Sequence, residues 1–314
     1  MFEVLLFSFS ITAPIFLWIL CGAILKSVGL LTDRWVARLS SLVFYVSLPM
    51  LMFFSVIRKP LGEVFDLGLT VVCMVATLVV YILSVLWTRR SGLLPRDATV
   101  IQQGALRGNL GIIGISLCLN AYGNEALVAV SMLMALLTIL YNLLSVYVFV
   151  AGLSEGRMSK KVLLRSLGKN PLIVAIAVGL PLAAVGIQVP AEVLKFSDGF
   201  VAATLPLALI AIGGSLSFRS VQQDLQRLVQ VAALKLLVAP LLGCLACVFM
   251  GYRGQSLGIV FLLLASPTAT ASFIMAKAYG ANHVLAANTV VFTTLLSLLS
   301  ISGGVFLLTF LELM

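Results

Sequence analysis

Ten apolar stretches, each long enough to cross a bilayer as a helix, divide this sequence of 314 residues. They are residues 4–25, 36–57, 67–87, 100–121, 125–150, 170–187, 198–217, 229–250, 255–278 and 284–311. A helix of about 20 apolar residues spans the hydrocarbon core and satisfies its own backbone hydrogen bonds there. The pattern therefore predicts an all-α polytopic membrane protein with ten transmembrane helices.

The composition supports a lipid environment. Hydrophobic residues make up 61% of the chain and charged residues only 10%, whereas soluble domains carry about 25% charged residues. So few charges would not cover the surface of a water-soluble core of this size. The first residues, Met1-Phe2-Glu3-Val4, lack the basic residues that begin a signal peptide. We therefore expect the first apolar stretch to be retained as a membrane helix.

The net charge of +9 does not indicate a nucleic-acid partner, because the basic residues lie in short clusters between the apolar stretches. Segments that follow odd-numbered helices hold fourteen of the 20 Lys and Arg residues, and segments that follow even-numbered helices hold four. Cytoplasmic loops carry the excess of Lys and Arg. We therefore expect a protein of the cell membrane (inner or plasma membrane) with both termini on the non-cytoplasmic side.

The side chains that usually carry catalysis are scarce. The single histidine, His283, falls in the short segment before the last apolar stretch. A zinc site needs about four ligands, and a nucleophilic enzyme needs a nucleophile beside a base. We predict no metal, no cofactor and no enzymatic activity, and we interpret the five cysteines as small buried hydrophobes. They are Cys21, Cys73, Cys118, Cys244 and Cys247.

The two halves of the chain repeat at a constant offset of 157 residues. The matching positions include Pro14 and Pro171, Gly29 and Gly186, Pro49 and Pro206, and Tyr122 and Tyr279. Residues 1–157 and 158–314 would thus form two repeats of five helices each. Five crossings are an odd number, so the second repeat enters the membrane from the opposite side. Inverted repeats of this kind are typical of secondary transporters, and a purely structural gene duplication is the alternative.

The fourth helix of each repeat contains residues that interrupt a helix. The fourth apolar stretch contains Arg107, Gly108, Asn109, Leu110 and Gly111, and the ninth contains Ser266, Pro267, Thr268 and Thr270. Glycine lowers helix propensity, and proline removes a backbone donor. Backbone groups freed by such breaks must face protein or a water-filled cavity, and half-helix N-termini suit an anionic ligand. We predict a binding site at these nine residues, although small residues also permit close helix packing.

Arg107 and Lys235 are the only basic residues well inside the predicted spans, and no acidic residue lies comparably deep. Such residues are costly in lipid and often functional. Arg107 would be either a counter-charge for a bound carboxylate or a helix-end anchor. Lys235 would lie either near the substrate or with its ammonium extended to the membrane surface. If a cation is coupled to transport, backbone carbonyls and hydroxyls would have to bind it.

Five segments carry a resemblance to a known family. They are Asn109-Leu110-Gly111-Ile112-Ile113-Gly114, Lys169-Asn170-Pro171-Leu172, Leu205-Pro206-Leu207 with Gly213-Gly214-Ser215-Leu216, and Ala265-Ser266-Pro267-Thr268-Ala269. Over nearly its whole length the chain resembles the auxin efflux carrier family, in a prokaryotic-type form without the long central loop of plant auxin carriers. The resemblance implies a five-plus-five inverted-repeat fold with broken crossing helices 4 and 9, similar to bile-acid symporters and some sodium/proton antiporters.

The resemblance also implies that some helices form a scaffold and the others a transport domain. Residues 4–57 and 170–217 would form a scaffold, often dimeric, and residues 67–150 and 229–311 a transport domain. Relatives move organic anions, including auxin and dicarboxylates such as malonate or malate. Plant carriers have a proline in the first crossover where this chain has glycines, which argues against auxin itself.

The sequence thus predicts a secondary transporter that moves a small organic anion, auxin-like or a mono- or dicarboxylate, by elevator-like alternating access. Coupling to protons or to sodium is left open, as is a homodimer through the scaffold helices. A membrane channel and a non-transporting membrane sensor are the alternatives. A channel would need a continuous polar face on several helices, whereas the polar residues here concentrate at the two breaks.

Overall fold

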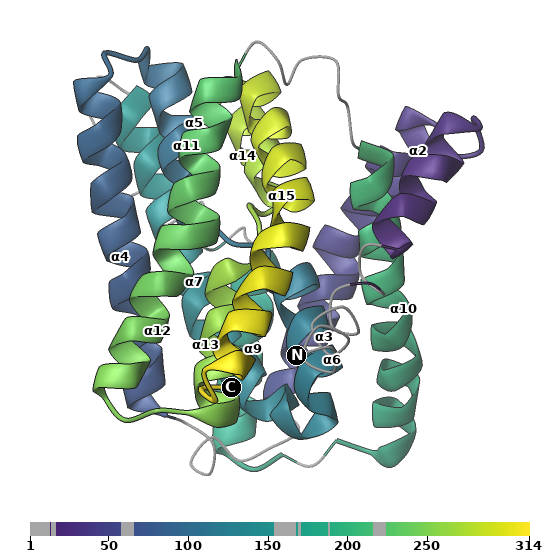
Figure 1. Cartoon of the computed structure of the whole chain (residues 1–314). Coiled ribbons are helices and arrows are strands. Elements are labelled where there is room, and N and C mark those ends of the chain that lie inside the picture. The colour runs from purple at the N-terminus through teal and green to yellow at the C-terminus, as the bar shows by residue number, and fades with distance from the viewer. Residues whose placement is uncertain are drawn as a thin grey trace.

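The computed structural model describes residues 13, 17–57, 66–153, 168, 171–187, 189–215 and 224–314. The regular elements in these ranges are helices (Figure 1). The α-helices are α2 (Asp33–Leu42), α3 (Leu48–Ile57), α4 (Leu67–Arg90), α5 (Pro95–Leu106), α6 (Ile115–Tyr122), α7 (Leu127–Leu153), α9 (Pro171–Ala184), α10 (Ala191–Ser215), α11 (Leu225–Ala233), α12 (Ala239–Phe249), α13 (Gly254–Ala265), α14 (Ala271–Tyr279) and α15 (His283–Phe310). Residues Leu17–Ser27 form a further short apolar helix.

Three π-helical segments and a 3₁₀ turn join some of these helices. The π segments are η1 (Val43–Ser47), η2 (Leu110–Gly114) and η5 (Leu234–Val238), and the 3₁₀ turn is η3 (Gly123–Ala126). Both η1 and η5 end two residues before a proline, Pro49 or Pro240. A proline ring clashes with the carbonyl four residues earlier, and a wider π turn makes room for it. Proline thus explains why these helices widen there.

Four helical runs are long and apolar enough to cross a membrane: Leu67–Arg90, Ala129–Leu153, Leu225–Phe249 and His283–Phe310. Leu110–Tyr122 and Gly254–Ala265 are shorter apolar helices, because each belongs to a pair that a break divides. The expectation of an all-helical polytopic membrane protein is therefore confirmed. The ten crossings and the inverted repeat stay predictions, and parts of the first predicted span and of the basic segment 152–169 lie outside the described residues.

Charged residues proved poor markers of helix ends. The helix α10 begins at Ala191, seven positions before the predicted span 198–217. Its first turns carry Glu192, Lys195 and Asp198, all exposed. A helix continues through charged residues where it emerges from the apolar layer, since its backbone bonds are made within the helix wherever it lies.

The helices form two groups that lie side by side in Figure 1. In one group α2, α3, α9 and α10 pack on one another, and in the other α4 to α7 pack with α11 to α15. The groups meet where α7 contacts α3 and α9 and where η2 contacts α10. The helix 17–27 joins the first group, because Gly22 and Gly213 let its backbone touch that of α10.

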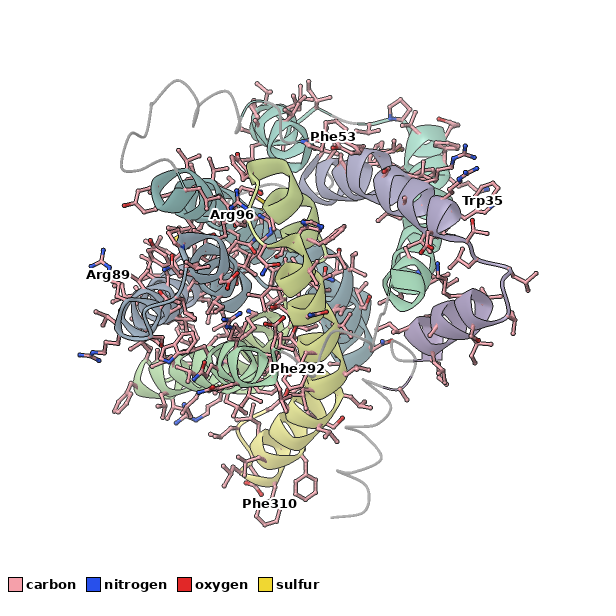
Figure 2. All side chains as sticks on the ribbon, turned by 90° about the horizontal axis from the view of Figure 1, so that it is seen from above. Trp35, Phe53, Arg89, Arg96, Phe292 and Phe310 are labelled. Carbon is pink, nitrogen blue, oxygen red and sulfur yellow. The ribbon has the colours of Figure 1, made fainter. Side chains whose placement is uncertain are left out.

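The outer surface of the molecule is strongly apolar. Phe249 is 88% exposed, Leu299 71% and Phe310 61%. Seen from above, Trp35, Arg89 and Phe310 lie at the rim of the helices and point outward (Figure 2). Large apolar side chains that face outward on several helices would be poorly solvated by water, and lipid suits them.

The main core surrounds α13, which is buried on all sides. Every residue from Leu257 to Ala265 is buried, and the helix contacts α4, α6, α12 and α15. A helix that is apolar all round belongs at the centre of a bundle. The break at the end of α13 therefore lies deep in the second group of helices.

Candidate functional site at a helix crossing

The two predicted breaks are present and meet each other. The helix α5 ends at Leu106 before η2 begins at Leu110, and α13 ends at Ala265 before α14 begins at Ala271. Gly108 and Thr268 form an antiparallel β-bridge. The Asn109 N–H donates to the Pro267 carbonyl at 2.7 Å, and the Ala269 N–H donates to the Arg107 carbonyl at 3.1 Å. Two extended segments thus cross as a short ladder inside a helical protein.

Carbonyl groups that lose their helical donors at the crossing gain side-chain donors instead. Because Pro267 has no N–H, the Leu263 carbonyl accepts from the Ser266 hydroxyl at 2.6 Å. The Thr268 hydroxyl donates to the Gly104 carbonyl at 2.8 Å, which joins the second break to α5. The Thr268 N–H in turn donates to the Thr293 hydroxyl at 3.1 Å. Such pairing meets the requirement that buried backbone polar groups find partners.

Gly108 is required by the close approach of the two segments. A Cβ atom at this position would lie 2.5 Å from Ser266 Oγ and 2.9 Å from Lys235 Nζ. Real Cβ contacts are essentially never that short, so no larger residue fits without displacing one of these groups. The glycine therefore brings the crossing, a hydroxyl and an ammonium together.

Lys235 is buried, with 1% of its surface exposed. Its ammonium donates to the Leu264 carbonyl at 3.0 Å, near the end of α13, and lies 6.0 Å from the centre of the Tyr141 ring. Of the two interpretations of Lys235, the one with its ammonium at the membrane surface does not describe this arrangement. Within the described part of the chain Lys235 forms no ion pair.

Arg107 is also buried, with 4% of its surface exposed. It ends α5 and directs its guanidinium to α7, where Nη1 donates to Asn142 Oδ1 at 2.8 Å and approaches Ser145 Oγ at 3.4 Å. The sulfur of Met275 in α14 lies 3.5 Å away. Among the described residues no carboxylate pairs with this guanidinium. Arg107 thus lies at a helix end and also carries a charge that no described carboxylate neutralises.

Buried polar atoms near the crossing that have no hydrogen-bond partner among the described groups include Asn109 Nδ2, Ser272 Oγ and, beside Lys235, Tyr141 Oη. Asn109 is 5% exposed and Ser272 2% exposed. An unsatisfied buried polar group costs about 1–3 kcal/mol, so each such group calls for an explanation. Asn109 occupies the position before η2 without a capping hydrogen bond from its side chain, and the first backbone N–H groups of a helix have no partner within the helix.

The remaining predicted residues flank the crossing, and their side chains make no polar contact with the described part of the chain. Leu110 is buried and Gly111 half-buried at the start of η2. Thr270 is half-buried, and its carbonyl accepts from the Phe273 N–H at 3.2 Å as α14 begins. The structure thus brings Arg107, Gly108, Asn109, Lys235 and the segment 266–268 together, with the other residues at their flanks.

Sequence reasoning missed the residues that hold the crossing from α7 and α15. Asn142 and Ser145 bind Arg107, and Thr293 binds Thr268. A signal was available, because Thr138, Asn142 and Ser145 recur at three- and four-residue spacing within an apolar helix. That spacing places polar groups on one face, and interhelical polar contacts in membrane proteins use such faces.

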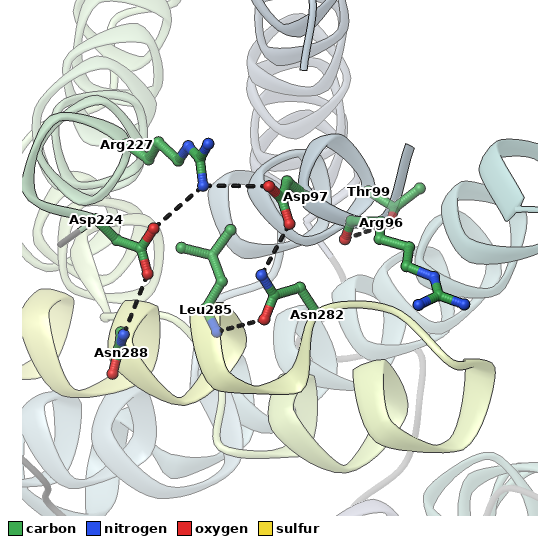
Figure 3. Close-up of polar contacts among 8 residues, drawn as sticks. All are labelled: Arg96, Asp97, Thr99, Asp224, Arg227, Asn282, Leu285 and Asn288. Atoms are coloured by element: carbon green, nitrogen blue, oxygen red, sulfur yellow. Dashed lines mark hydrogen bonds and ion pairs between the residues drawn. The ribbon is translucent and has the colours of Figure 1, made fainter. Parts of the chain in front are cut away.

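A second polar network links the N-terminal ends of three helices (Figure 3). Asp97 of α5 accepts from Asn282 Nδ2 at 2.8 Å and pairs with Arg227 of α11 at 3.1 Å. Arg227 also pairs with Asp224 at 3.1 Å, and Asn288 of α15 lies 3.4 Å from the second oxygen of Asp224. These contacts brace the ends of α5, α11 and α15 against one another and lie apart from the crossing.

At the opposite ends of these helices, a different set of segments meets. Tyr252 Oη, between α12 and α13, donates to Asp66 Oδ1 at 2.9 Å, and Asp66 also caps α4. The Gly254 N–H donates to the Leu313 carbonyl after α15 at 2.8 Å. Within the described residues no cluster of three or more His, Cys, Asp or Glu side chains suits a metal ion.

Comparison with known proteins decides the family. A family model described as "Membrane transport protein" matches residues 7–304. The chain belongs to this family, the auxin efflux carrier family. It is 26% identical over 290 residues to an "Uncharacterized transporter" of Methanothermobacter thermautotrophicus, covering 90% of this chain and 92% of the relative. It is 27% identical over 277 residues to a "Putative malonate transporter" of Rhizobium meliloti, covering 86% of each chain. The expected family is confirmed, and the chain is a multi-pass membrane transport protein.

Proposed function

We propose that this transport protein is a secondary carrier for a small organic anion such as a mono- or dicarboxylate. The observation that carries the proposal is the pair of buried cations, Arg107 and Lys235, that flank the crossing without an ion pair in the described structure. A buried charge without a partner is strongly unfavourable. An anion bound beside them would offset that cost, and the name of the Rhizobium meliloti relative supports a dicarboxylate.

Asn109 would orient the anion in this site. Its Nδ2 group is a buried donor without a described acceptor, and a carboxylate oxygen is a strong acceptor for such a donor. The N-terminus of η2, which Asn109 precedes, adds partial positive charge. We therefore assign substrate contact to Arg107, Gly108, Asn109, Leu110, Gly111, Lys235, Ser266, Pro267, Thr268 and Thr270.

The proposed architecture is an inverted repeat of 1–157 and 158–314, with five helices each. Glycines with positive φ end helices at equivalent places in both halves. Gly29 (79°) and Gly186 (69°) follow the first helix of each half, and Gly123 (66°) and Gly280 (75°) follow the helix after each break. Both pairs are 157 residues apart. Such left-handed glycines are common helix ends, and their shared offset supports the repeat.

The proposed orientation puts both termini on the non-cytoplasmic side of the cell membrane. Segments after the third, seventh and ninth predicted helices, which would be cytoplasmic, meet in the network around Asp97 and Arg227. Segments after the second, eighth and tenth helices meet around Asp66, Tyr252 and Leu313. Segments after odd-numbered helices thus meet at one end and segments after even-numbered helices at the other, which supports the predicted order of membrane crossings. The excess of basic residues on the odd-numbered segments indicates which end is cytoplasmic.

The proposed mechanism is elevator-like movement of one group of helices past the other. The crossing lies in the group of α4 to α7 and α11 to α15, which is braced internally at both ends. The other group, residues 17–57 and 171–215, would be the scaffold and the site of any homodimer contact. A continuous pore is less well supported, because the described polar contacts of the core concentrate at one crossing.

The test is uptake of labelled mono- and dicarboxylates by liposomes that contain the purified protein. We expect saturable uptake and counterflow for the wild type. Asn109→Ala should lose saturable uptake by about tenfold or more, the effect of one lost charge-assisted hydrogen bond, while its elution profile and thermal stability stay near wild type. Unchanged uptake in Asn109→Ala would remove Asn109 from the site. Non-saturable flux without counterflow would indicate a channel, and no flux of any anion would favour a sensor.

A further inference from the structure

The Leu264 carbonyl, near the end of α13, accepts a hydrogen bond from a side chain of another helix. In an unbroken helix this carbonyl would accept from the N–H of Thr268. That N–H is instead bonded to Thr293 Oγ1 at 3.1 Å. The carbonyl is therefore freed by the break, and the ammonium of Lys235 binds it at 3.0 Å. Lys235 comes from a different helix, in the π segment η5.

Carbonyls freed by a helix break are cation ligands in many transporters. Unwound carbonyls and the C-terminal ends of half-helices coordinate the sodium ion or proton that drives transport. The end of α13 has this character, because it is a half-helix C-terminus with partial negative charge. In this chain a covalently attached ammonium already binds one of these carbonyls.

We infer that Lys235 is a built-in replacement for a coupling cation, so that this carrier requires no sodium ion to bind its substrate or to move. The inference rests on the proposed carrier function, because it concerns what that carrier needs in order to work. The positive charge that sodium would bring with the substrate is then supplied by the Lys235 ammonium, which would balance the bound substrate anion.

The local packing fits this role for Lys235. The side chain is 1% exposed, and Gly108 leaves room for its ammonium beside the first break. Its other neighbours are neutral, since the Ser266 hydroxyl lies at the same point of the crossing and the Tyr141 ring faces the ammonium. Neutral oxygens suffice for a monovalent cation, and no described carboxylate fixes Lys235 as a structural ion pair.

Two substitutions separate this role from a merely structural one. Lys235→Ala removes the ammonium and leaves space beside the free Leu264 carbonyl, so an added cation has a place to bind. Lys235→Met removes the charge but fills the space with a side chain of similar length. We therefore expect Ala, and not Met, to be rescued by an added cation. Lys195→Ala, which removes an exposed lysine of α10, is the matched control.

The experiment measures thermal stability and carboxylate uptake in sodium, lithium, methylammonium and choline chloride at one ionic strength. Carboxylate uptake by the wild type and by Lys195→Ala should agree within about twofold in all four salts. A twofold difference is smaller than the effect of losing one hydrogen bond. Lys235→Ala should lose uptake by about tenfold or more in choline and regain much of it in sodium or methylammonium. Thermal stability of Lys235→Ala should rise with the same cations, and Lys235→Met should respond to none.

The outcomes distinguish the two proposals. Wild-type uptake that requires sodium, or a Lys235→Ala variant that no cation stabilises, would overturn the role of Lys235 and leave the carrier function intact. Cation-specific stabilisation of Lys235→Ala in a protein that moves no organic anion would support the cation site and overturn the proposed function. If Lys235→Ala does not fold, sodium-independent uptake by the wild type and by Lys235→Arg still supports the inference, and sodium dependence in either still overturns it.

Discussion

The backbone N–H of Asn109 and the carbonyl of Pro267 are joined by a hydrogen bond of 2.7 Å, although the residues come from different halves of the chain. The reciprocal bond from Ala269 to the Arg107 carbonyl makes this a ladder. Backbone groups alone therefore hold the crossing at its centre. The Asn109 side chain takes no part in this ladder, which leaves its unpartnered Nδ2 for a ligand.

Gly108→Ala should displace the Ser266 hydroxyl and the Lys235 ammonium that lie beside this ladder. Its Cβ would lie 2.5 Å from Ser266 Oγ and 2.9 Å from Lys235 Nζ, and overpacking of a buried site costs about 1–3 kcal/mol. We expect a lower free energy of unfolding, measured by denaturation in detergent, and loss of carboxylate uptake. Gly303→Ala is the matched control, since nothing lies within 4 Å of its Cβ and alanine favours a helix by up to about 1 kcal/mol. Equal stability of the two variants would contradict the close crossing.

The breaks themselves could be predicted from sequence because their causes are local. Pro267 cannot donate a hydrogen bond, and glycines weaken a helix wherever it lies. The family resemblance implied that the two breaks cross, and the bond from Asn109 to Pro267 shows that they meet. Arg107 could be expected beside the first break because it precedes Asn109 by two residues, whereas the depth of Lys235 left two positions open for its ammonium, near the substrate or at the membrane surface.

The spacing of polar residues in α7 could indicate a polar face, but the residues that this face contacts could not be predicted, because they depend on which helices are neighbours. Nothing in the sequence near Arg107 indicates that Asn142 of α7 accepts its hydrogen bond. Nothing in the sequence indicates that Lys235 donates to the Leu264 carbonyl either, because every residue has a backbone carbonyl and the sequence does not show which one is the acceptor. The π segment that carries Lys235 was also missed, although Pro240 follows it and supplies a reason for the wider turn.

Arg107 and Asn142 should be energetically coupled. Nη1 of Arg107 donates to Asn142 Oδ1 at 2.8 Å, and both residues are buried. A double-mutant cycle of Arg107→Met and Asn142→Leu should give a coupling free energy of about 1–3 kcal/mol, as for contacting polar groups. Apparent unfolding free energies in mixed detergent are the measurement. Arg107→Met combined with Ser131→Ala is the control pair, and its effects should be additive within about 0.5 kcal/mol. A coupling free energy between Arg107 and Asn142 that is no larger than this would show that their hydrogen bond does not contribute to stability.

The bond from Tyr252 to Asp66 should make stability depend on pH in the alkaline range. It lies in a segment between helices, and the hydrogen bond to the Asp66 carboxylate raises the pKa of Tyr252 above its usual 10.0. The folded protein therefore holds the phenol proton at pH values where the unfolded chain releases it. This contribution to stability is complete below pH 10 and is lost as pH rises through the higher pKa of the folded state.

Tyr252→Phe should therefore lose less stability than the wild type as the pH is raised above 10, and its stability at neutral pH should be slightly lower because the bond is absent. Thermal unfolding of both proteins at a series of alkaline pH values is the measurement. Asp66→Asn is the informative second variant, since asparagine still caps α4 and still accepts a hydrogen bond but carries no charge. If the carboxylate causes the shift, Asp66→Asn should resemble Tyr252→Phe above pH 10. An alkaline loss identical in all three proteins would mean that other groups govern it.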